Sequence, residues 1–192
     1  MNLNFSDEQN LLRDSVSRFC TSDYDFETRM KSVNSDSGFS KEHWKLFADL
    51  GWLAVPFDEE LGGLGGDVLD LSILFEEFGK SIVVEPYLAN VVLAGGVLKR
   101  SGFDKKDEYL SSIVSGEKQF SLANYEPEKG YNLENIETVL DDKGLLSGSK
   151  STVLNAPNAD YFIVFSKKGD DFCFSPVSYT HLTLPTKVGV GV

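Results

Sequence analysis

Two polar stretches marked by glycine, in the last third of the chain, carry side chains that suit ligand binding. They read FSLANYEPEKGYN from residue 120 and GSKSTVLNAP from residue 148. Glycine lets the backbone approach a ligand closely, and the neighbouring hydroxyl and amide side chains add hydrogen-bonding groups. The pattern predicts two turns that present a ligand site, and simple hairpin turns at Gly130 and Gly148 are the alternative.

Three other groups of residues are weaker candidates for chemistry. His43 has no second His, Cys or carboxylate at ligand spacing, so a solvated or core-edge role is favoured. Glu76 and Glu77 are adjacent on a predicted helix and point in different directions, which does not suit paired acid and base catalysis. The glycine-rich loop at 62–66 lacks the preceding strand and the Gly-x-Gly-x-x-Gly spacing of a phosphate-binding loop.

The composition argues against several classes of protein. The formal net charge is −12 and the basic residues are scattered, whereas nucleic-acid-binding proteins cluster Lys and Arg to neutralise phosphates. No apolar run is long enough to span a membrane, and the N-terminus lacks the basic and apolar regions of a signal peptide. We therefore expect a cytoplasmic protein without a membrane span or a nucleic-acid partner. Cys20 and Cys173 are expected to be free thiols.

Residues 1–117 are expected to form an N-terminal all-α helical bundle. Apolar residues recur at helical spacing after several capping residues. The residues predicted as N-caps are Ser6, Ser40 and Asp67. Gly79 is predicted to close the helix that follows Asp67, and Glu85-Pro86 to open a largely apolar central helix.

From about residue 118 the apolar period changes to two, which indicates short strands. Asp142-Lys143-Gly144 and Lys168-Gly169-Asp170 predict tight turns, and Ser151 to Leu154 is predicted to be one of the strands. Residues 118–176 are therefore expected to form a small, truncated antiparallel β-barrel domain, which places the chain in the α+β class.

Three stretches occur together in an order and at a spacing that are typical of one family. They are GWLAVPFDEELGGLGG with the later EEFGK, then EPEKGYN, then GSKSTVLNAPNADYFIVF. Over residues 3–174 they resemble the acyl-CoA dehydrogenase family. EPEKGYN is similar to that family's turn Glu-Pro-x-x-Gly-Ser-Asp, and the third stretch is similar to its Asn-Gly-x-Lys-x-Trp-Ile-Thr-Asn and the apolar strand that follows.

The resemblance implies a flavoprotein that removes two hydrogens from an acyl-CoA substrate, with FAD as the hydride acceptor. It also implies an electron-transfer flavoprotein or a similar acceptor as partner, and a dimer or tetramer at full length. In the family a C-terminal helical domain carries the catalytic glutamate. That domain is absent from this sequence, so no catalytic residue and no metal ligand are predicted, and the chain alone is expected to be inactive.

The resemblance also places FAD against the turn around Glu126 and Pro127 and against residues 152–154. The residues predicted to contact FAD are Asn124, Tyr125, Gly130, Tyr131, Thr152, Val153 and Leu154. Four of them replace side chains that bond or pack against the flavin in the family, namely Tyr125, Tyr131, Thr152 and Leu154. These replacements support an alternative in which the chain is a non-catalytic scaffold or interaction module derived from the fold.

The last part of the chain departs from the family's pattern. After Phe174 the sequence loses register with the strands that the family has there, and residues 177–192 are predicted to be a non-native tail. No role is assigned to His181, which lies in this tail.

Overall fold

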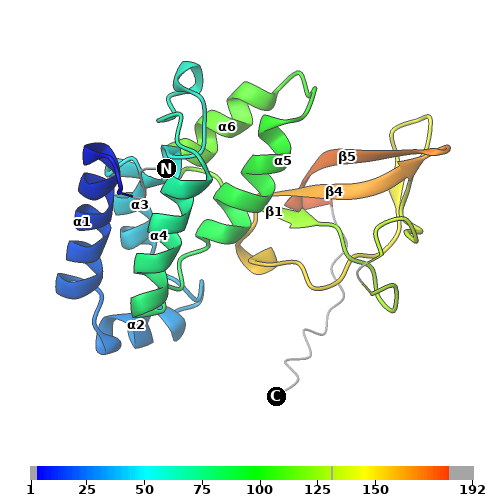
Figure 1. The fold of residues 1–192 in the computed structure, drawn as a ribbon. Helices are drawn as coiled ribbons and strands as arrows, with labels where there is room; N and C mark the ends of the chain where they lie inside the picture. Colours follow the sequence, from blue (N-terminus) through cyan, green and yellow to red (C-terminus); the bar gives the residue numbers. More distant parts are fainter. Residues whose placement is uncertain (1–3, 131, 182–192) are drawn as a thin grey trace. The chain divides into compact units, whose positions relative to one another are not determined.

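The computed structural model describes residues 4–130 and 132–181 and divides the chain between Gln119 and Phe120. The first part, which we call the helical unit, is all-α, and the second, the β unit, contains one sheet (Figure 1). The predicted α+β class is therefore confirmed.

The helical unit consists of short helices joined by tight loops. Its α-helices are α1 (Asp7–Ser22), α2 (Phe26–Val33), α3 (Lys41–Asp49), α4 (Val68–Ser81), α5 (Gly95–Lys99) and α6 (Lys106–Val114). Two 3₁₀ turns, η1 (Trp52–Ala54) and η2 (Glu59–Leu61), lie between α3 and α4, and a π-helical segment, η3 (Leu88–Ala94), leads directly into α5. The predicted central helix is therefore a π-helical turn followed by an α-helix.

The predicted N-caps are confirmed. The Ser6 side chain accepts a hydrogen bond from the backbone N–H of Gln9, and the Gln9 side-chain oxygen accepts one from the backbone N–H of Ser6. Ser40 caps α3 in the same way through the N–H of His43. Asp67 forms a capping box with Asp70 at the start of α4. These bonds satisfy N–H groups that a helix leaves unpaired in its first turn.

Aromatic side chains form the centre of the helical unit. Phe47 is stacked on Phe78 with ring centroids 5.2 Å apart, and Trp52 lies 4.9 Å from Phe47. Phe19 meets Phe47 edge-on. The hydroxyl of buried Tyr87 donates a 2.8 Å hydrogen bond to the Trp52 carbonyl, so its polar end is satisfied.

The predicted end of α4 at Gly79 is wrong. The helix continues to Ser81, and Ile82 adopts the left-handed C-cap conformation with φ of 52°. A β-branched residue is unfavourable there, and glycine is the usual choice. Gly79 thus lies inside a helix rather than at its end.

The β unit is built around one long hairpin. Its strands are β1 (Phe120–Ala123), β2 (Val139–Leu140), β3 (Leu146–Ser147), β4 (Tyr161–Lys168) and β5 (Asp171–Ser178). The turns predicted at 142–144 and 168–170 are confirmed, because they join the antiparallel pairs β2–β3 and β4–β5.

The predicted antiparallel barrel is wrong in two respects. β1 runs parallel to β4, with Phe120 opposite Tyr161, and β2 also runs parallel to β4. The sheet is therefore mixed, and in the described residues it does not close on itself. The long connection between β1 and β4, which includes the β2–β3 hairpin, returns the chain to the same end of the sheet, as a parallel pair requires.

The segment 151–154 is not a strand, although alternation predicted one. Thr152 has φ of 53°, which breaks an extended conformation, and a 3₁₀ turn, η4 (Ala156–Asn158), follows. At the other end of the unit, Val177 and Ser178 belong to β5 and pair with Phe162 and Tyr161. The origin of residues 177–192 stays a prediction, and those after His181 lie outside the described residues.

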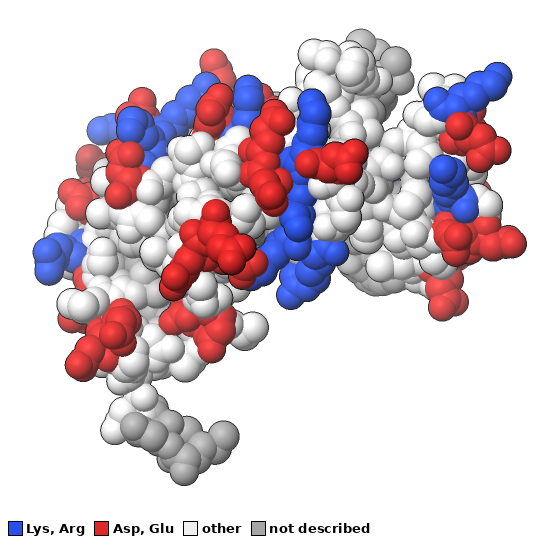
Figure 2. All heavy atoms as spheres, turned by 90° about the horizontal axis from the view of Figure 1, so that it is seen from above, with Lys and Arg blue, Asp and Glu red and all other residues white. Residues whose placement is uncertain are grey.

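The surface charges are mixed. On the face drawn in Figure 2, Lys and Arg side chains lie among Asp and Glu side chains. Lys45 pairs with Asp49 and Lys99 with Asp58. No helix in the described part of the chain is long and apolar enough to cross a bilayer. Among the same residues, no group of three His, Cys, Asp or Glu side chains is arranged to hold a metal ion.

Candidate functional site

The two glycine-marked stretches of the sequence lie side by side in the β unit. The backbone N–H of Ser151 donates a 2.9 Å hydrogen bond to the carbonyl of Tyr125. Beside this hydrogen bond, the ammonium of Lys150, the residue before Ser151, lies 2.9 Å from a carboxylate oxygen of Glu126, the residue after Tyr125. The fold therefore joins segments that are far apart in the sequence into one surface.

Glu126 is the centre of a buried polar network. Its side chain is 4% exposed and that of Lys150 is 9% exposed. One carboxylate oxygen accepts hydrogen bonds from Lys150, from the Thr138 hydroxyl and from the Thr138 backbone N–H, and the other accepts one from the Glu137 N–H at 2.7 Å. A buried charge is tolerated when it is paired and hydrogen-bonded in this way.

The network fixes the ionisation of Glu126. Burial alone raises the pKa of this carboxyl, but the Lys150 ammonium, the Thr138 hydroxyl and the two backbone N–H groups outweigh it and lower the pKa to about 2. Glu126 is therefore a carboxylate at every physiological pH. It is better suited to hold Lys150 and the neighbouring backbone in place than to transfer protons.

Gly148 is required by close packing beside this network. A Cβ on Gly148 would lie 2.7 Å from the Thr138 Cα and 2.5 Å from its hydroxyl oxygen. A larger residue would therefore push Thr138 away from Glu126. Gly130 has φ of 61° and open space around the position of a Cβ, so this glycine is needed for the turn and not for packing.

Residues 152–154 form a strained, open edge of the surface. Thr152 has a left-handed backbone, which is unusual for a β-branched residue, and such strain is concentrated at functional sites. Within residues 4–130 and 132–181, the backbone N–H groups of Thr152, Val153 and Leu154 donate to no acceptor. Leu154 is 49% exposed. The edge thus offers three backbone donors beside exposed apolar surface.

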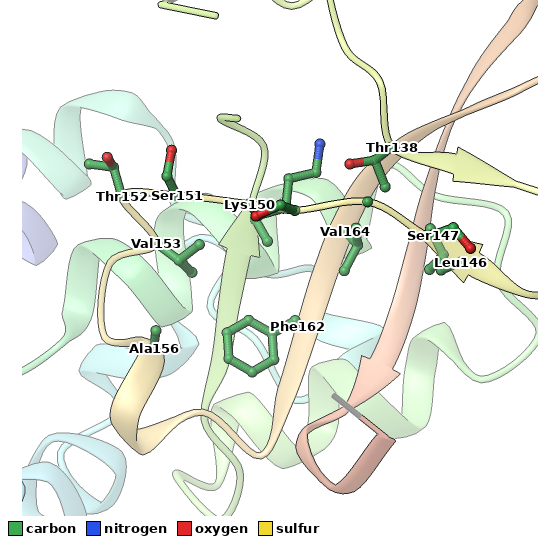
Figure 3. A pocket seen from close by; sticks show the side chains of 13 residues that line it. Thr138, Leu146, Ser147, Lys150, Ser151, Thr152, Val153, Ala156, Phe162 and Val164 are labelled. Atoms are coloured by element: carbon green, nitrogen blue, oxygen red, sulfur yellow. The ribbon is translucent and has the colours of Figure 1, made fainter. Parts of the chain in front are cut away.

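A cavity of about 380 Å³ lies beneath the segment that contains these residues. Its apolar floor is the face of the sheet that carries Ala123, Phe162 and Val164. Figure 3 shows Val153 on the side of the segment that faces Phe162, whereas the hydroxyl of Thr152 points to the opposite side. The segment therefore separates an apolar interior from a polar outer surface.

The structure brings together most of the residues predicted to contact FAD. Asn124 and Tyr125 are half-buried directly after β1, and Thr152, Val153 and Leu154 follow Ser151, which is hydrogen-bonded to Tyr125. Gly130 is exposed in the turn after Glu126. Tyr131 lies outside the described residues. Contact of these residues with FAD stays a prediction.

Thr138 and Lys150 were not predicted from the sequence as members of the site. Lys150 lies between two serines in a polar stretch, a pattern that normally indicates a solvated side chain. The sequence signal that could have identified Lys150 was its position in GSKS, one of the two glycine-marked stretches, because the other stretch contains Glu126.

His43, the weaker candidate in the helical unit, lies at the edge of the core as expected. Its Nδ1 is 3.4 Å from a carboxylate oxygen of Glu85, whose side chain is fully buried. The Tyr24 hydroxyl donates a 2.8 Å hydrogen bond to the same carboxylate and accepts one from the Val84 N–H. This arrangement ties α3 and the loop after α1 to the segment that connects α4 with η3.

Comparison with known proteins identifies the family. The model of the acyl-CoA dehydrogenase N-terminal domain matches residues 6–117, which is more than half of the chain. The chain belongs to the acyl-CoA dehydrogenase family. The predicted family is thereby confirmed.

Individual members of the acyl-CoA dehydrogenase family match both units. L-prolyl-[peptidyl-carrier protein] dehydrogenase from Serratia sp. is 31% identical over 191 residues, which cover 93% of this chain and 48% of that protein. Caffeyl-CoA reductase-Etf complex subunit CarC from Acetobacterium woodii is 30% identical, with 85% of this chain and 44% of that protein covered. The solved structure of PigA with FAD and proline superposes with a TM-score of 0.81 at 27% identity and covers 93% of this chain and 50% of PigA. This chain therefore spans about half the length of these relatives.

Proposed function

We propose that this chain is the front part of a flavin-dependent acyl-CoA dehydrogenase and provides one wall of its FAD site. The observation that carries the proposal is the attachment of residues 125–126 to residues 150–151, through the Ser151–Tyr125 hydrogen bond and the Glu126–Lys150 ion pair. Because of it, the two stretches predicted to contact FAD form a single surface. The family membership and the similarity to a protein solved with FAD support the proposal.

The residues present fit a flavin. The backbone N–H groups at 152–154 have no acceptor among the described residues and can donate to polar atoms of the ring, and Leu154 offers apolar contact. The open space at Gly130 allows the backbone of the turn to approach the pyrophosphate. The side-chain replacements at Tyr125 and Thr152 leave these backbone groups in place.

The roles of this chain's own residues follow from that fit. Glu126 and Lys150 hold the turn and the segment 150–154 at a fixed separation, and Thr138 completes the shell around the carboxylate. Bound FAD supplies the two-electron acceptor for α,β-dehydrogenation of the substrate. The base that removes the α-proton is assigned to the half of the protein that lies beyond this chain.

The substrate is proposed to be an acyl thioester, with acyl-CoA as the first choice. The relative named as a prolyl-carrier-protein dehydrogenase makes a carrier-bound acyl group the competing choice. The relative named as part of a reductase-Etf complex supports an electron-transfer flavoprotein as acceptor. A homo-oligomer, dimer or tetramer, and a cytoplasmic location complete the proposal.

The test is flavin content and reduction in the protein extended along its coding sequence past Val192. We expect it to purify with the visible absorption of bound flavin, and this absorption to bleach when an acyl-CoA is added without oxygen. If only a carrier-bound acyl group bleaches the flavin, the proposed substrate would be wrong and the proposed dehydrogenation would stand. A colourless protein that does not take up added FAD would contradict the proposal and favour the non-catalytic module.

A pair of lysine variants makes the test specific to the candidate site. Lys150→Met removes the buried partner of Glu126, and we expect the extended protein to lose flavin. Lys129→Met is the control, because Lys129 pairs with the mostly exposed Glu137. Equal flavin content in the two variants would contradict the role of the Glu126–Lys150 pair.

A further inference from the structure

Glu85 is a buried carboxylate of the helical unit, and no lysine or arginine lies within ion-pair distance of it among residues 4–130 and 132–181. Its side chain is 0% exposed. One carboxylate oxygen accepts a 2.8 Å hydrogen bond from the Tyr24 hydroxyl, and the other lies 3.4 Å from the Ser40 backbone nitrogen and 3.4 Å from His43 Nδ1. A buried carboxylate is costly without a counter-charge, and His43 is the group in the described part of the chain that can supply one.

The facing atoms of His43 and Glu85 need a proton between them. His43 Nδ1 is buried and makes no hydrogen bond with the described residues. In a neutral imidazole with its proton on Nε2, Nδ1 presents a lone pair, which repels a carboxylate oxygen. A neutral imidazole with its proton on Nδ1 can donate but brings no charge. Only the imidazolium supplies both the donor and the counter-charge.

Aromatic rings hold the imidazole of His43 beside Glu85. The Phe19 ring meets it edge-on with centroids 5.3 Å apart, and the Tyr24 ring lies 5.4 Å from it. The His43 side chain is nevertheless 17% exposed. The pair is therefore fixed in position, and its imidazole can still exchange a proton with the solvent.

From this geometry we propose that the His43–Glu85 pair is a pH-dependent switch in the helical unit, closed while His43 is protonated and weakened when it is neutral. Histidine is the side chain whose charge ordinarily changes between about pH 5 and 8. Loss of the proton leaves Glu85 as a buried carboxylate without a counter-charge. The stability that the pair contributes is therefore present at the lower pH and lost as the pH rises.

The pair joins α3 to the segment that connects α4 with η3. The Val84 N–H donates a 3.0 Å hydrogen bond to the Tyr24 hydroxyl, which itself donates to Glu85. Further along, Asn90 of η3 donates a 3.2 Å hydrogen bond from its side chain to the Lys118 carbonyl near the end of the helical unit. Weakening the pair should therefore loosen the approach to η3, and through η3 the end of this unit.

The titratable groups on α1 and in the loop after it do not compete with His43 in this pH range. Burial raises the pKa of the Cys20 thiol and that of the Tyr24 hydroxyl. Both groups therefore stay largely protonated up to about pH 8.5. Tyr24 remains a hydrogen-bond donor to Glu85 throughout.

The charged groups from α2, α3 and α4 around the pair keep their charge as well. The Arg29 guanidinium donates to the Ser81 carbonyl at 3.1 Å, and arginine is always protonated in proteins. On α4, hydrogen bonds to Glu77 and Glu76 raise the pKa of Lys80, so its ammonium stays charged. On α3, a backbone N–H and the hydroxyl of the N-cap serine lower the pKa of Glu42, which stays a carboxylate.

The test compares the pH dependence of stability in the native 192-residue chain and in His43→Gln. Glutamine keeps a neutral donor near Glu85 but cannot be protonated. Between about pH 6 and 8.5, the melting temperature of the native chain should fall by about 2–4 °C more than that of the variant. Over the same range, the hydrogen-exchange protection of the Val84 N–H should fall by about tenfold more in the native chain.

Three further variants identify the titrating group. His181→Gln is the matched control, because His181 is the other histidine of the sequence and is exposed in the β unit, so the native pH dependence should remain. Tyr24→Phe removes a hydroxyl and neither charge, so it should keep the pH dependence too. Glu85→Gln removes the carboxylate and should abolish the dependence as His43→Gln does.

Each outcome supports or overturns the switch. An equal pH dependence in the native chain and in His43→Gln would overturn it. Loss of the dependence in His181→Gln or in Tyr24→Phe would overturn it as well, because another group would then titrate. If His43→Gln does not fold, Glu85→Gln decides, and a native pH dependence in that variant would overturn the switch. None of these measurements reads flavin, so the result is independent of the proposed function.

Discussion

The helical unit buries a cluster of aromatic rings at its centre, whereas the candidate site of the β unit is organised around a carboxylate and an ammonium. Phe47 and Phe78 stack in the first. Glu126 and Lys150 pair in the second. Apolar burial has no preferred direction and tolerates small shifts, while a buried ion pair is stabilising only with its hydrogen bonds in place. The two units are therefore expected to unfold under different conditions.

The largest effect is expected from removing a ring in the helical unit. Phe47→Ala deletes a fully buried side chain and should lower the free energy of unfolding by about 3–5 kcal/mol. Denaturant unfolding followed by tryptophan fluorescence measures this, because both tryptophans, Trp44 and Trp52, lie in the helical unit. Leu11→Ala, at a site that is 70% exposed, is the control and should be nearly neutral. Similar losses for both variants would contradict the assigned core.

Removing the Lys150 ammonium should lower the stability of the β unit by nearly as much. The effect should be seen in hydrogen exchange and not in tryptophan fluorescence. Lys150→Met leaves the Glu126 carboxylate buried without its counter-charge, which destabilises the unit by about 3 kcal/mol. Amide hydrogen exchange in β1 and β4 should accelerate while the tryptophan signal stays unchanged. Lys129→Met breaks a more exposed pair, and the free energy of opening derived from hydrogen exchange should change by less than about 1 kcal/mol. Loss of the tryptophan signal in the Lys150 variant would show that the units do not unfold separately.

Acid should separate the two units without a mutation. The pKa of Glu126 is lowered from 4.5 to about 2 in the folded protein. A lowered pKa contributes stability above the unfolded value of 4.5, and this contribution is lost as the pH falls toward 2. At about 1.4 kcal/mol per pKa unit, its full size is about 3 kcal/mol. Hydrogen exchange of the β unit between pH 5 and about 3 should show the loss, and Glu126→Gln should reduce the pH dependence. An unchanged pH dependence in that variant would contradict the network.

The smallest effect is a gain of stability at the strained edge. Thr152→Asn keeps a polar side chain and tolerates the left-handed backbone, so it should stabilise the β unit by about 0.5–1 kcal/mol. Ser151→Asn, at the neighbouring position, provides the matched control and should not stabilise. If flavin binding depends on this geometry, the extended protein should keep its flavin content in the Thr152 variant. Destabilisation by Thr152→Asn would mean that the threonine side chain itself is needed.

Local sequence signals predicted much of the fold. Capping at Ser6 and Ser40 and the two hairpin turns needed only a few neighbouring residues, and all are present. The same reasoning was wrong where distant residues decide. Gly79 was expected to end α4, but the helix continues to Ser81, whose carbonyl accepts a hydrogen bond from Arg29 and whose hydroxyl donates one to the Cys20 carbonyl. Alternation at 151–154 suggested a strand, but the Ser151–Tyr125 bond and the turn at Thr152 hold the segment in another conformation.

The sequence by itself determined the family, the helical character of residues 6–117 and the two stretches that form the candidate site. These follow from local propensity, spacing and motif, which are properties of neighbouring residues. Only the tertiary structure decided that β1 and β4 are parallel and that Lys150 is buried against Glu126. The physical reason is that strand pairing and burial depend on the path of the chain between distant segments. The residues next to Lys150 in the sequence do not indicate that it pairs with Glu126, which lies 24 residues away.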